Sequence, residues 1–341
     1  MKTALKAAGW SFAALAVAAA AITAFAYPSY RDDVRAARAR IAGSKIAQTR
    51  CGPIEYTEAG KGPALLLVHG AGGGFDQSMM AFGEALAGQG FRVVAMSRFG
   101  YLRTPLPSDA SPAAQADAHA CLLDELRIGR AAIFGASAGA PSSMQFALRH
   151  PERTAGLFLL VPMTYTPGAP SLAPPAAARF VFEYGLKSDF LFWLLMKSVP
   201  NVLVRTILAT PVSALQAASD AEQRRIRMML EQPLPISERQ AGLLNDGAVL
   251  QALARYELEG IAAPTVVVSA RDDLYGTYEM ARYTAAAIPG ARFVGYESGG
   301  HMWAGHHAEV LAEISTFMHT VSRDPVRKPI SPAGRARRPS G

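Results

Sequence analysis

Six short apolar runs recur along the middle of the chain, and helical stretches separate most of them. The runs are Ala64–His69, Phe91–Met96, Ala131–Gly135, Gly156–Val161, Pro264–Ala270 and Arg292–Tyr296. Their apolarity is continuous rather than alternating, which is typical of strands that are buried on both faces of a parallel sheet. The pattern therefore predicts an α/β fold, in which helices flank a mostly parallel central sheet.

The spacing of these runs is interrupted once. Between Pro162 and about Ile261 only helical patterns occur, at residues 176–199 and 217–231, and prolines separate them. The interruption predicts a helical insertion, residues 163–261, which divides the core of the fold into residues 51–162 and 262–322. We expect most aromatic and methionine side chains of the insertion to be ordinary core.

The chain of 341 residues carries a formal net charge of +7, which is concentrated at its two ends. Residues 1–50 contain 8 basic and 2 acidic residues, and residues 323–341 contain 6 and 1, which leaves 20 and 24 in residues 51–322. The part expected to fold is thus mildly acidic, and we expect no nucleic-acid partner. The C-terminal stretch, rich in Arg, Pro, Ser and Gly, is predicted to be a disordered basic tail.

An apolar segment opens the chain within residues 1–50. Lys6 and Arg31 bracket 24 residues without a formal charge, Ala7–Tyr30. About 20 helical residues span the core of a bilayer, so the segment predicts one membrane-anchoring helix followed by a basic linker. The alternative is a cleaved signal peptide on an exported protein, because Ala24-Phe25-Ala26 has the form of a cleavage site. Basic residues on both sides leave the orientation in the membrane open.

The chain contains two cysteines, Cys51 and Cys121. No further cysteine or histidine stands near either of them at the spacing of a metal site, so they predict neither a metal centre nor a disulfide framework. We therefore expect two small buried side chains.

A serine between two glycines follows the third apolar run. Gly135-Ala136-Ser137-Ala138-Gly139 is a G-x-S-x-G sequence between a predicted strand and a helical stretch that ends near His150. At such a junction the glycines permit a tight turn that exposes the serine hydroxyl. Serine is a weak nucleophile on its own, so it needs an adjacent base, which in turn needs an orienting acid.

Candidates for the acid and the base follow the last two runs. Arg271-Asp272-Asp273 comes after Pro264–Ala270, and Gly299-Gly300-His301 comes after Arg292–Tyr296. Because the carboxyl ends of parallel strands share one edge of a sheet, we expect both loops to meet near Ser137. The order Ser, Asp, His is also the order found in this type of site.

Together these motifs resemble the α/β-hydrolase superfamily, and within it the serine hydrolases with a helical cap, over roughly Gly52–Thr320. The resemblance implies that His301 is the base and that Asp273, the last residue of a G-x-x-D turn, is the acid. This turn reads Ala270-Arg271-Asp272-Asp273 here. Because its first glycine is missing, Asp272 stays open as the acid.

Two more histidines, His306 and His307, follow His301 closely. We expect them to be polar residues at the start of a helix over Ala308–Phe317. A metal centre built from the three histidines is disfavoured, because there is neither a matching carboxylate nor an H-E-x-x-H pair.

A glycine cluster, His69–Gly74, ends the first apolar run and resembles the oxyanion loop of the family. The resemblance implies that the backbone N–H groups of Ala71 and Ala138 stabilise the oxyanion, with Gly72 as a third candidate. His69 is expected to brace this loop, and Asp76 to cap the helix that follows. The cluster lacks the spacing of a phosphate-binding loop, so we expect no nucleotide, and the chemistry needs no cofactor.

One loop departs from the family's pattern. Ser97-Arg98-Phe99-Gly100-Tyr101 stands where many relatives have an aspartate that opens a D-x-x-G-x-G turn. How this loop is braced is therefore left open by the sequence.

These residues predict a serine hydrolase of the carboxylesterase type, which cleaves esters of small or medium acyl chains through an acyl-enzyme on Ser137. A serine at this turn disfavours the relatives that form an alkyl ester on aspartate. Hydrolysis of a carbon–carbon bond in a vinylogous diketone, of a lactone or of an amide stays open, as does a non-catalytic ligand-binding protein. The expected partner is a small ester or acyl substrate. Chain length, leaving group and oligomeric state are not selected by the sequence.

Overall fold

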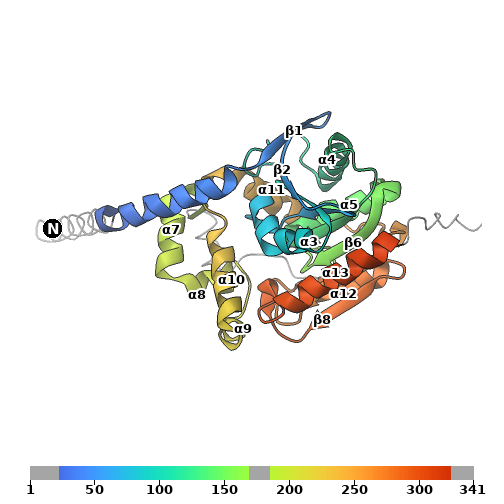
Figure 1. Ribbon diagram of the computed structural model, residues 1–341. Coiled ribbons are helices and arrows are strands. Elements are labelled where there is room, and N and C mark those ends of the chain that lie inside the picture. Colours follow the sequence, from blue (N-terminus) through green and yellow to red (C-terminus); the bar gives the residue numbers. More distant parts are fainter. Residues whose placement is uncertain (1–22, 169–184, 324–341) are drawn as a thin grey trace, which may run out of the picture.

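An eight-stranded sheet runs through the computed structural model, which describes residues 23–168 and 185–323 (Figure 1). The strand order is β1-β2-β4-β3-β5-β6-β7-β8, and all neighbours from β4 to β8 are parallel. The first two strands are antiparallel to their neighbours. The strands are β1 (Lys45–Thr49), β2 (Gly52–Ala59), β3 (Ala64–Val68), β4 (Arg92–Met96), β5 (Ala131–Ala136), β6 (Thr154–Leu160), β7 (Thr265–Ala270) and β8 (Arg292–Tyr296).

Helices cover both faces of this sheet. They are α2 (Phe75–Ser78), α3 (Glu84–Gly88), α4 (Pro112–Glu125), α5 (Ala140–Arg149), α12 (Thr277–Ala287) and α13 (His307–Arg323), with a π-helical turn at Met79–Gly83. Alternate residues of the strands point to opposite faces, so Leu65 and Leu67 pack in one core cluster and Leu66 and Val68 in the other. The first cluster contains side chains of α3 and α13, and the second contains those of α4, α5 and α12.

The predicted α/β fold is confirmed, and the six predicted runs correspond to β3–β8. The pattern missed β1 and β2. Both strands are polar and only partly buried, because they form the antiparallel edge of the sheet. They therefore lack the continuous apolar run that identifies a central parallel strand.

Between β6 and β7 the described chain is helical, as the pattern predicts. The helices are α7 (Asp189–Ser198), α8 (Pro200–Thr206), α9 (Val212–Ala217), α10 (Asp220–Glu231) and α11 (Gln240–Gln251). Residues 176–184 of the predicted pattern and residues 324–341 of the predicted tail lie outside the described residues. The division of the chain into a core and a cap of residues 163–261 stays a prediction.

The predicted membrane anchor is corrected by the structure. The described chain opens with a helix over residues 23–41, whose second half carries charged residues at positions 31, 32, 33, 35, 38 and 40. This helix packs on α7, where Trp193 Nε1 donates to the carboxylate of Asp33 at 2.8 Å and the ring of Tyr30 lies edge-on to Phe190 at 5.2 Å. Along residues 23–168 and 185–323, no helix has the length and apolarity needed to cross a membrane. Residues 7–22 of the predicted anchor lie outside the described residues.

The prediction that the two cysteines are separate buried side chains is also wrong. Cys51 and Cys121 form a disulfide, with their Cα atoms 6.1 Å apart. The bridge joins the turn before β2 to helix α4. The 70-residue separation leaves no local signal for the pairing, since two cysteines that far apart meet only through the fold.

Candidate active site

Ser137 lies in a sharp turn between β5 and α5, with a backbone φ of +48°. Such a left-handed conformation is strained in a residue other than glycine and is typical of an exposed nucleophile at a strand-to-helix turn. The flanking glycines let neighbouring atoms pack closely against this turn. A Cβ on Gly139 would clash with the carbonyl oxygen of His69, at 2.6 Å, and one on Gly135 would clash with Ser143 Oγ. The local sequence therefore determines how this serine is presented.

His301 lies beside Ser137, in a short helical turn after β8. Its Nε2 is 2.9 Å from Ser137 Oγ, and its Nδ1 is 2.7 Å from Asp273 Oδ2. Asp273 follows the end of β7, so the carboxyl ends of three parallel strands, β5, β7 and β8, deliver the three side chains to one edge of the sheet. Both His301 and Asp273 are buried, whereas Ser137 is half-buried.

The carboxylate of Asp273 is held by two donors besides His301. The N–H of Tyr275 donates to Oδ1 at 2.8 Å, and the hydroxyl of Thr277 donates to Oδ2. The carboxylate accepts the Nδ1–H of the imidazole, which leaves the Nε2 lone pair facing the serine. The ring of Tyr275 lies edge-on to the imidazole at 5.0 Å, and burial, with the charge of Asp273, raises the pKa of this tyrosine.

The neighbouring carboxylate, Asp272, has a different contact. Its Oδ1 accepts a hydrogen bond of 2.7 Å from the N–H of Gly300. The structure thus places Asp273 against the imidazole and Asp272 against the backbone that carries it.

His306 and His307 point to other partners. His306 stacks on Tyr296 at 4.1 Å and contacts Glu309 through Nδ1 at 2.9 Å. His307 is the first residue of α13, stacks on Phe82 at 5.2 Å, and has its pKa lowered by burial. Within the described parts of the chain, no group of three or more His, Cys, Asp or Glu side chains is arranged to hold a metal ion.

The helical insertion contacts the acid and base loops through a segment that sequence reasoning missed. The carbonyl of Ala209, between α8 and α9, accepts hydrogen bonds from the N–H groups of Leu274 (3.0 Å) and His301 (3.3 Å). The hydroxyl of Thr210 accepts another from the N–H of Met302 at 3.0 Å. Since every residue has a carbonyl, no sequence signal could have identified Ala209.

The predicted oxyanion loop, His69–Gly74, lies against the nucleophile: a Cβ on Gly70 would be 3.1 Å from Ser137 Cβ. The side chain of His69 braces this loop, as its Nδ1 donates to the carbonyl of Gly70 (2.7 Å) and its Nε2 accepts from the N–H of Arg98 (2.9 Å). Burial and the charge of Arg98 hold the pKa of His69 well below its usual value, in keeping with a neutral imidazole.

The three candidate oxyanion donors differ in their surroundings. The N–H of Gly72 donates to the hydroxyl of Tyr101 at 3.3 Å, so it is already used. The N–H of Ala71 lies in the same loop, and Ala138 directly follows the nucleophile. Ala71 and Ala138 are therefore the better candidates.

Asp76, the second residue of α2, does not cap this helix, contrary to expectation. Its carboxylate pairs instead with Arg239, at 2.8 and 3.1 Å, and the Arg239 side chain is fully buried. Arg239 also donates to the carbonyl of Gly73. This arginine precedes α11, so the helical insertion reaches the oxyanion loop as well.

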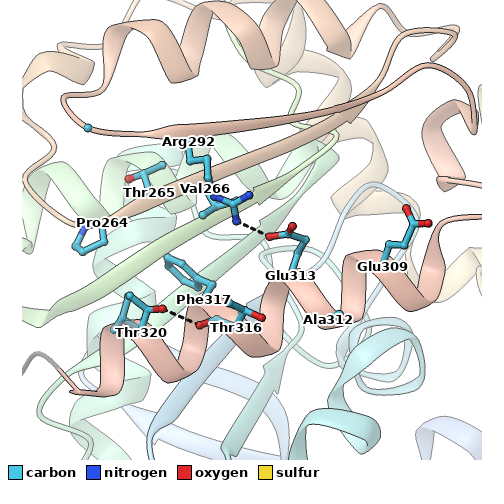
Figure 2. A pocket seen from close by; sticks show the side chains of 12 residues that line it. Pro264, Thr265, Val266, Arg292, Glu309, Ala312, Glu313, Thr316, Phe317 and Thr320 are labelled. Atoms are coloured by element: carbon cyan, nitrogen blue, oxygen red, sulfur yellow. Dashed lines mark hydrogen bonds and ion pairs between the residues drawn. The ribbon is translucent and has the colours of Figure 1, made fainter.

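A groove of about 710 Å³ elsewhere in the molecule is not part of this site (Figure 2). It lies between α13 and the start of strands β7 and β8, and the Arg292–Glu313 ion pair is on its wall. The candidate residues follow the opposite ends of the same two strands.

A strand–turn–helix serine, with an imidazole and a carboxylate aligned behind it at the carboxyl edge of a parallel sheet, defines a class of hydrolytic enzymes. The chain belongs to the alpha/beta hydrolase fold family, because the model of that family matches residues 63–304. The predicted resemblance to the α/β-hydrolase superfamily is thereby confirmed, and the protein is a hydrolase.

Several proteins are similar to this chain over most of its length. The uncharacterized hydrolase YcgS of Bacillus subtilis is 28% identical over 272 residues, covering 77% of this chain and 93% of its own. A 2-hydroxy-6-oxononadienedioate/2-hydroxy-6-oxononatrienedioate hydrolase of Paraburkholderia xenovorans is 27% identical, with coverage of 75% and 86%. Among solved structures, an alpha/beta hydrolase fold protein from Nakamurella multipartita superposes with a TM-score of 0.66 at 26% identity, covering 82% of this chain and 100% of that one.

Proposed function

We propose that this hydrolase cleaves carboxylic esters of small or medium acyl chains through an acyl-enzyme on Ser137. The observation that carries the proposal is the continuous hydrogen-bonded path from Ser137 Oγ through His301 to Asp273, with distances of 2.9 and 2.7 Å. This arrangement supplies a nucleophile, a base and an orienting acid in the geometry that acyl transfer requires.

In the proposed reaction, Nε2 of His301 takes the proton of Ser137 as Oγ attacks the ester carbonyl. Asp273 stabilises the imidazolium that forms, and the N–H groups of Ala71 and Ala138 stabilise the oxyanion. His301 then gives its proton to the departing alcohol, which leaves the acyl group on Ser137. A water molecule, deprotonated by the same imidazole, attacks the acyl-enzyme and releases the acid and the free serine.

The helical insertion is proposed to cover the site as an apolar cap formed by residues 163–261. A Cβ on Gly72 would lie 3.6 Å from Pro233 and 3.8 Å from Leu243, so apolar side chains of the insertion face the oxyanion loop. Such a surface favours a hydrocarbon acyl group over a charged one.

A second candidate is hydrolysis of a carbon–carbon bond in a vinylogous diketone, because the Paraburkholderia relative is named for such a substrate. That substrate is a dianion, which needs unpaired positive charge nearby. The guanidinium groups that contact the oxyanion loop, those of Arg98 and Arg239, are each paired with a buried carboxylate. This pairing favours a neutral ester.

The experiment that tests the proposal compares p-nitrophenyl acetate, butyrate and octanoate with a lactone, an amide and a vinylogous diketone. We expect the highest kcat/KM with one of the esters, and a loss of about 10⁶-fold in the Ser137→Ala variant. A higher kcat/KM with the diketone would assign the carbon–carbon reaction instead.

A further inference from the structure

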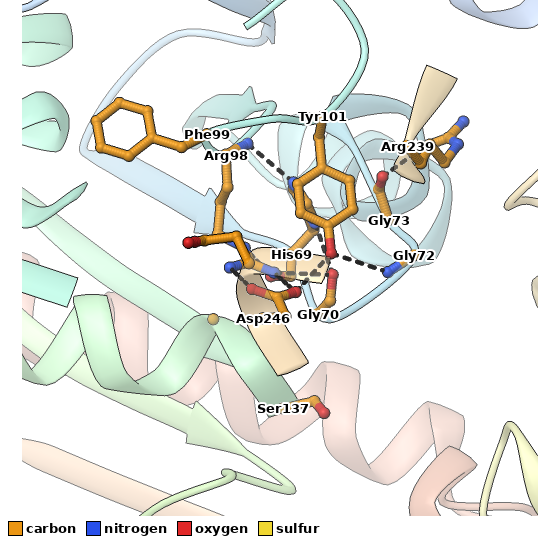
Figure 3. A network of polar contacts seen from close by, with 12 residues as sticks. His69, Gly70, Gly72, Gly73, Arg98, Phe99, Tyr101, Ser137, Arg239 and Asp246 are labelled. Atoms are coloured by element: carbon orange, nitrogen blue, oxygen red, sulfur yellow. Dashed lines mark hydrogen bonds and ion pairs between the residues drawn. The ribbon is translucent and has the colours of Figure 1, made fainter. Parts of the chain in front are cut away.

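Asp246 is a buried carboxylate that the helical insertion places beneath the oxyanion loop. It lies on α11, and its two oxygens accept hydrogen bonds from Arg98 Nη1 at 2.7 Å and Nη2 at 2.6 Å. The hydroxyl of Tyr101 donates to the same carboxylate. Figure 3 shows Asp246 against Arg98 and Tyr101, close to the turn formed by residues 69–72.

Arg98 transmits this contact to the loop backbone. Its Nε donates to the carbonyl of His69 at 2.9 Å, and its Nη2 donates to the carbonyl of Gly70 at 3.3 Å. The carbonyl of Gly70 also accepts from His69 Nδ1 at 2.7 Å and from the N–H of Gly73 at 3.3 Å. Three donors therefore determine the direction of this one carbonyl.

The direction of the Gly70 carbonyl determines that of the Ala71 N–H. Both belong to one peptide group, which is planar and trans, so the C=O and the N–H point in opposite directions. On the far side of Ala71, the N–H of Gly72 is held by the hydroxyl of Tyr101 at 3.3 Å. Asp246 thus holds Arg98 and Tyr101, each of which restrains the peptide on one side of Ala71.

Stability alone does not account for this ion pair. The side chains of Arg98 and Asp246 are only 7% and 5% exposed, and two apolar side chains of similar volume usually stabilise such a site as well or better. An apolar pair would not direct the carbonyls of His69 and Gly70, because it has no N–H groups to donate.

We propose that Asp246 and Arg98 are positioning residues, which hold the N–H of Ala71 in the direction required to stabilise the oxyanion. Tyr101 helps to hold the same loop, because its hydroxyl accepts a hydrogen bond from the N–H of Gly72. The inference rests on the proposed function, since it concerns the transition state of acyl transfer. It also gives the helical insertion a role in the chemistry besides covering the site.

The test replaces the ion pair with apolar side chains, in the double variant Arg98→Met/Asp246→Leu. Its unfolding midpoint in urea should fall only moderately, since no unpaired charge is left buried, although the His69 carbonyl and the Tyr101 hydroxyl each lose a partner. Its kcat for p-nitrophenyl butyrate, per site titrated with a fluorophosphonate, should fall by roughly 10²-fold, with little change in KM. The inhibition constant of a trifluoromethyl ketone, whose adduct places an oxyanion in the same position, should rise in parallel.

A folded double variant that keeps the kcat and the inhibition constant of the unchanged protein would overturn the proposal. If the unchanged protein neither hydrolyses the ester nor reacts with the fluorophosphonate, the proposed function itself fails, and that result is visible before any variant is made. If the double variant does not fold, Tyr101→Phe decides, because it removes only a hydroxyl.

For Tyr101→Phe we expect a fall in kcat of about tenfold and a parallel rise in the inhibition constant; unchanged values would overturn the proposal. The matched control is Glu58→Gln, which weakens the Arg92–Glu58 ion pair (2.9 Å) between β2 and β4. Both quantities should stay unchanged in this control. A similar loss there would mean that any ion pair of the sheet has the same effect.

Discussion

The carboxylate of Asp272 accepts a hydrogen bond of 2.7 Å from the N–H of Gly300, the residue directly before His301. Gly300 has a φ of +61°, and a Cβ there would lie 2.6 Å from Thr210 Cα. The two adjacent aspartates therefore hold the imidazole in two ways, Asp272 through the backbone and Asp273 through the ring.

The two aspartates should respond differently to loss of charge. Asp273→Asn should lower kcat by about 10⁴-fold, because an amide at this position no longer stabilises the imidazolium and favours the wrong tautomer. Asp272→Asn keeps an oxygen that can accept from Gly300, so we expect a loss of less than about tenfold. Steady-state hydrolysis of p-nitrophenyl butyrate measures both, and equal losses would contradict the assignment of the acid.

Gly139→Ala should destabilise the fold through close contact alone. Gly139 has a φ of −79°, which suits any residue, but an added Cβ would lie 2.6 and 2.7 Å from the backbone carbonyl oxygens of His69 and Val68. Backbone atoms of a central strand cannot move aside cheaply, so the free energy of unfolding should fall by about 1–3 kcal/mol.

Gly129→Ala is the matched control for this substitution, because nothing lies within 4 Å of a Cβ at that position. Urea unfolding measures both variants. An equal change in the two would show that the contact with the backbone is not what excludes a side chain at Gly139.

The Cys51–Cys121 disulfide should contribute substantially to stability. It closes a loop across a separation of 70 residues. In the chain-entropy account, a cross-link over a loop of this length reduces the entropy of the unfolded chain and so raises the free energy of unfolding by about 4 kcal/mol. In the Cys51→Ala/Cys121→Ala variant, the free energy of unfolding measured in urea should fall by about this amount, while kcat per titrated site stays unchanged. An unfolding midpoint equal to that of the oxidised protein would contradict this prediction.

Stability should fall as the pH falls below about 6.5, because two histidines are buried in the neutral form. Burial lowers the pKa of His119 to about 3, and burial with the charge of Arg98 lowers that of His69. At pH values between the pKa of an unfolded histidine and these lowered pKa values, only the unfolded chain takes up the protons. Each of the two sites therefore lowers the free energy of unfolding by about 1.4 kcal/mol for every pH unit of acidification. The stabilisation is complete above the unfolded pKa and is lost on acidification.

His119→Gln isolates one of these two sites. His119 contacts Ser142 Oγ at 3.2 Å, and a glutamine can keep a polar contact there without titrating. The free energy of unfolding should then change less steeply with pH between pH 4.5 and 6. The slope should decrease by about 1.4 kcal/mol per pH unit, which is the contribution of one bound proton. An unchanged slope would show that His119 takes up its proton in the folded state too.

The sequence predicts the parts of the site that depend on local motifs and strand ends. Ser137 could be located from its glycines and its place between a strand and a helix, and the acid and base from the loops after the last two strands. The convergence of the carboxyl ends in a parallel sheet then brings the three loops together, without any knowledge of the packing between helices.

The bracing of the oxyanion loop could not be predicted in this way. Arg98 and Asp246 are 148 residues apart, and Asp76 and Arg239 are separated by 163. Sequence patterns assign charged side chains to the solvent, since they are almost never fully buried unless paired. Which charges are paired depends on how the helical insertion folds back over the sheet.

The same limit explains why the predictions for the apolar leader and for the two cysteines were wrong. The apolar leader indicated an anchor, whereas the described helix of residues 23–41 packs on α7 through Tyr30 and Asp33. Two lone cysteines indicated no bridge, whereas the fold brings the turn before β2 to α4. In both cases tertiary contacts, rather than local pattern, determine the outcome.

The central claim is that Ser137 is an activated nucleophile, and covalent labelling tests it most directly. The protein is incubated with a fluorophosphonate, digested, and analysed by mass spectrometry, with Ser137→Ala and Ser142→Ala in parallel. We predict a single adduct on the peptide that carries Ser137, which is lost in Ser137→Ala and kept in Ser142→Ala. An unlabelled protein, or an adduct that persists in Ser137→Ala, would contradict the account.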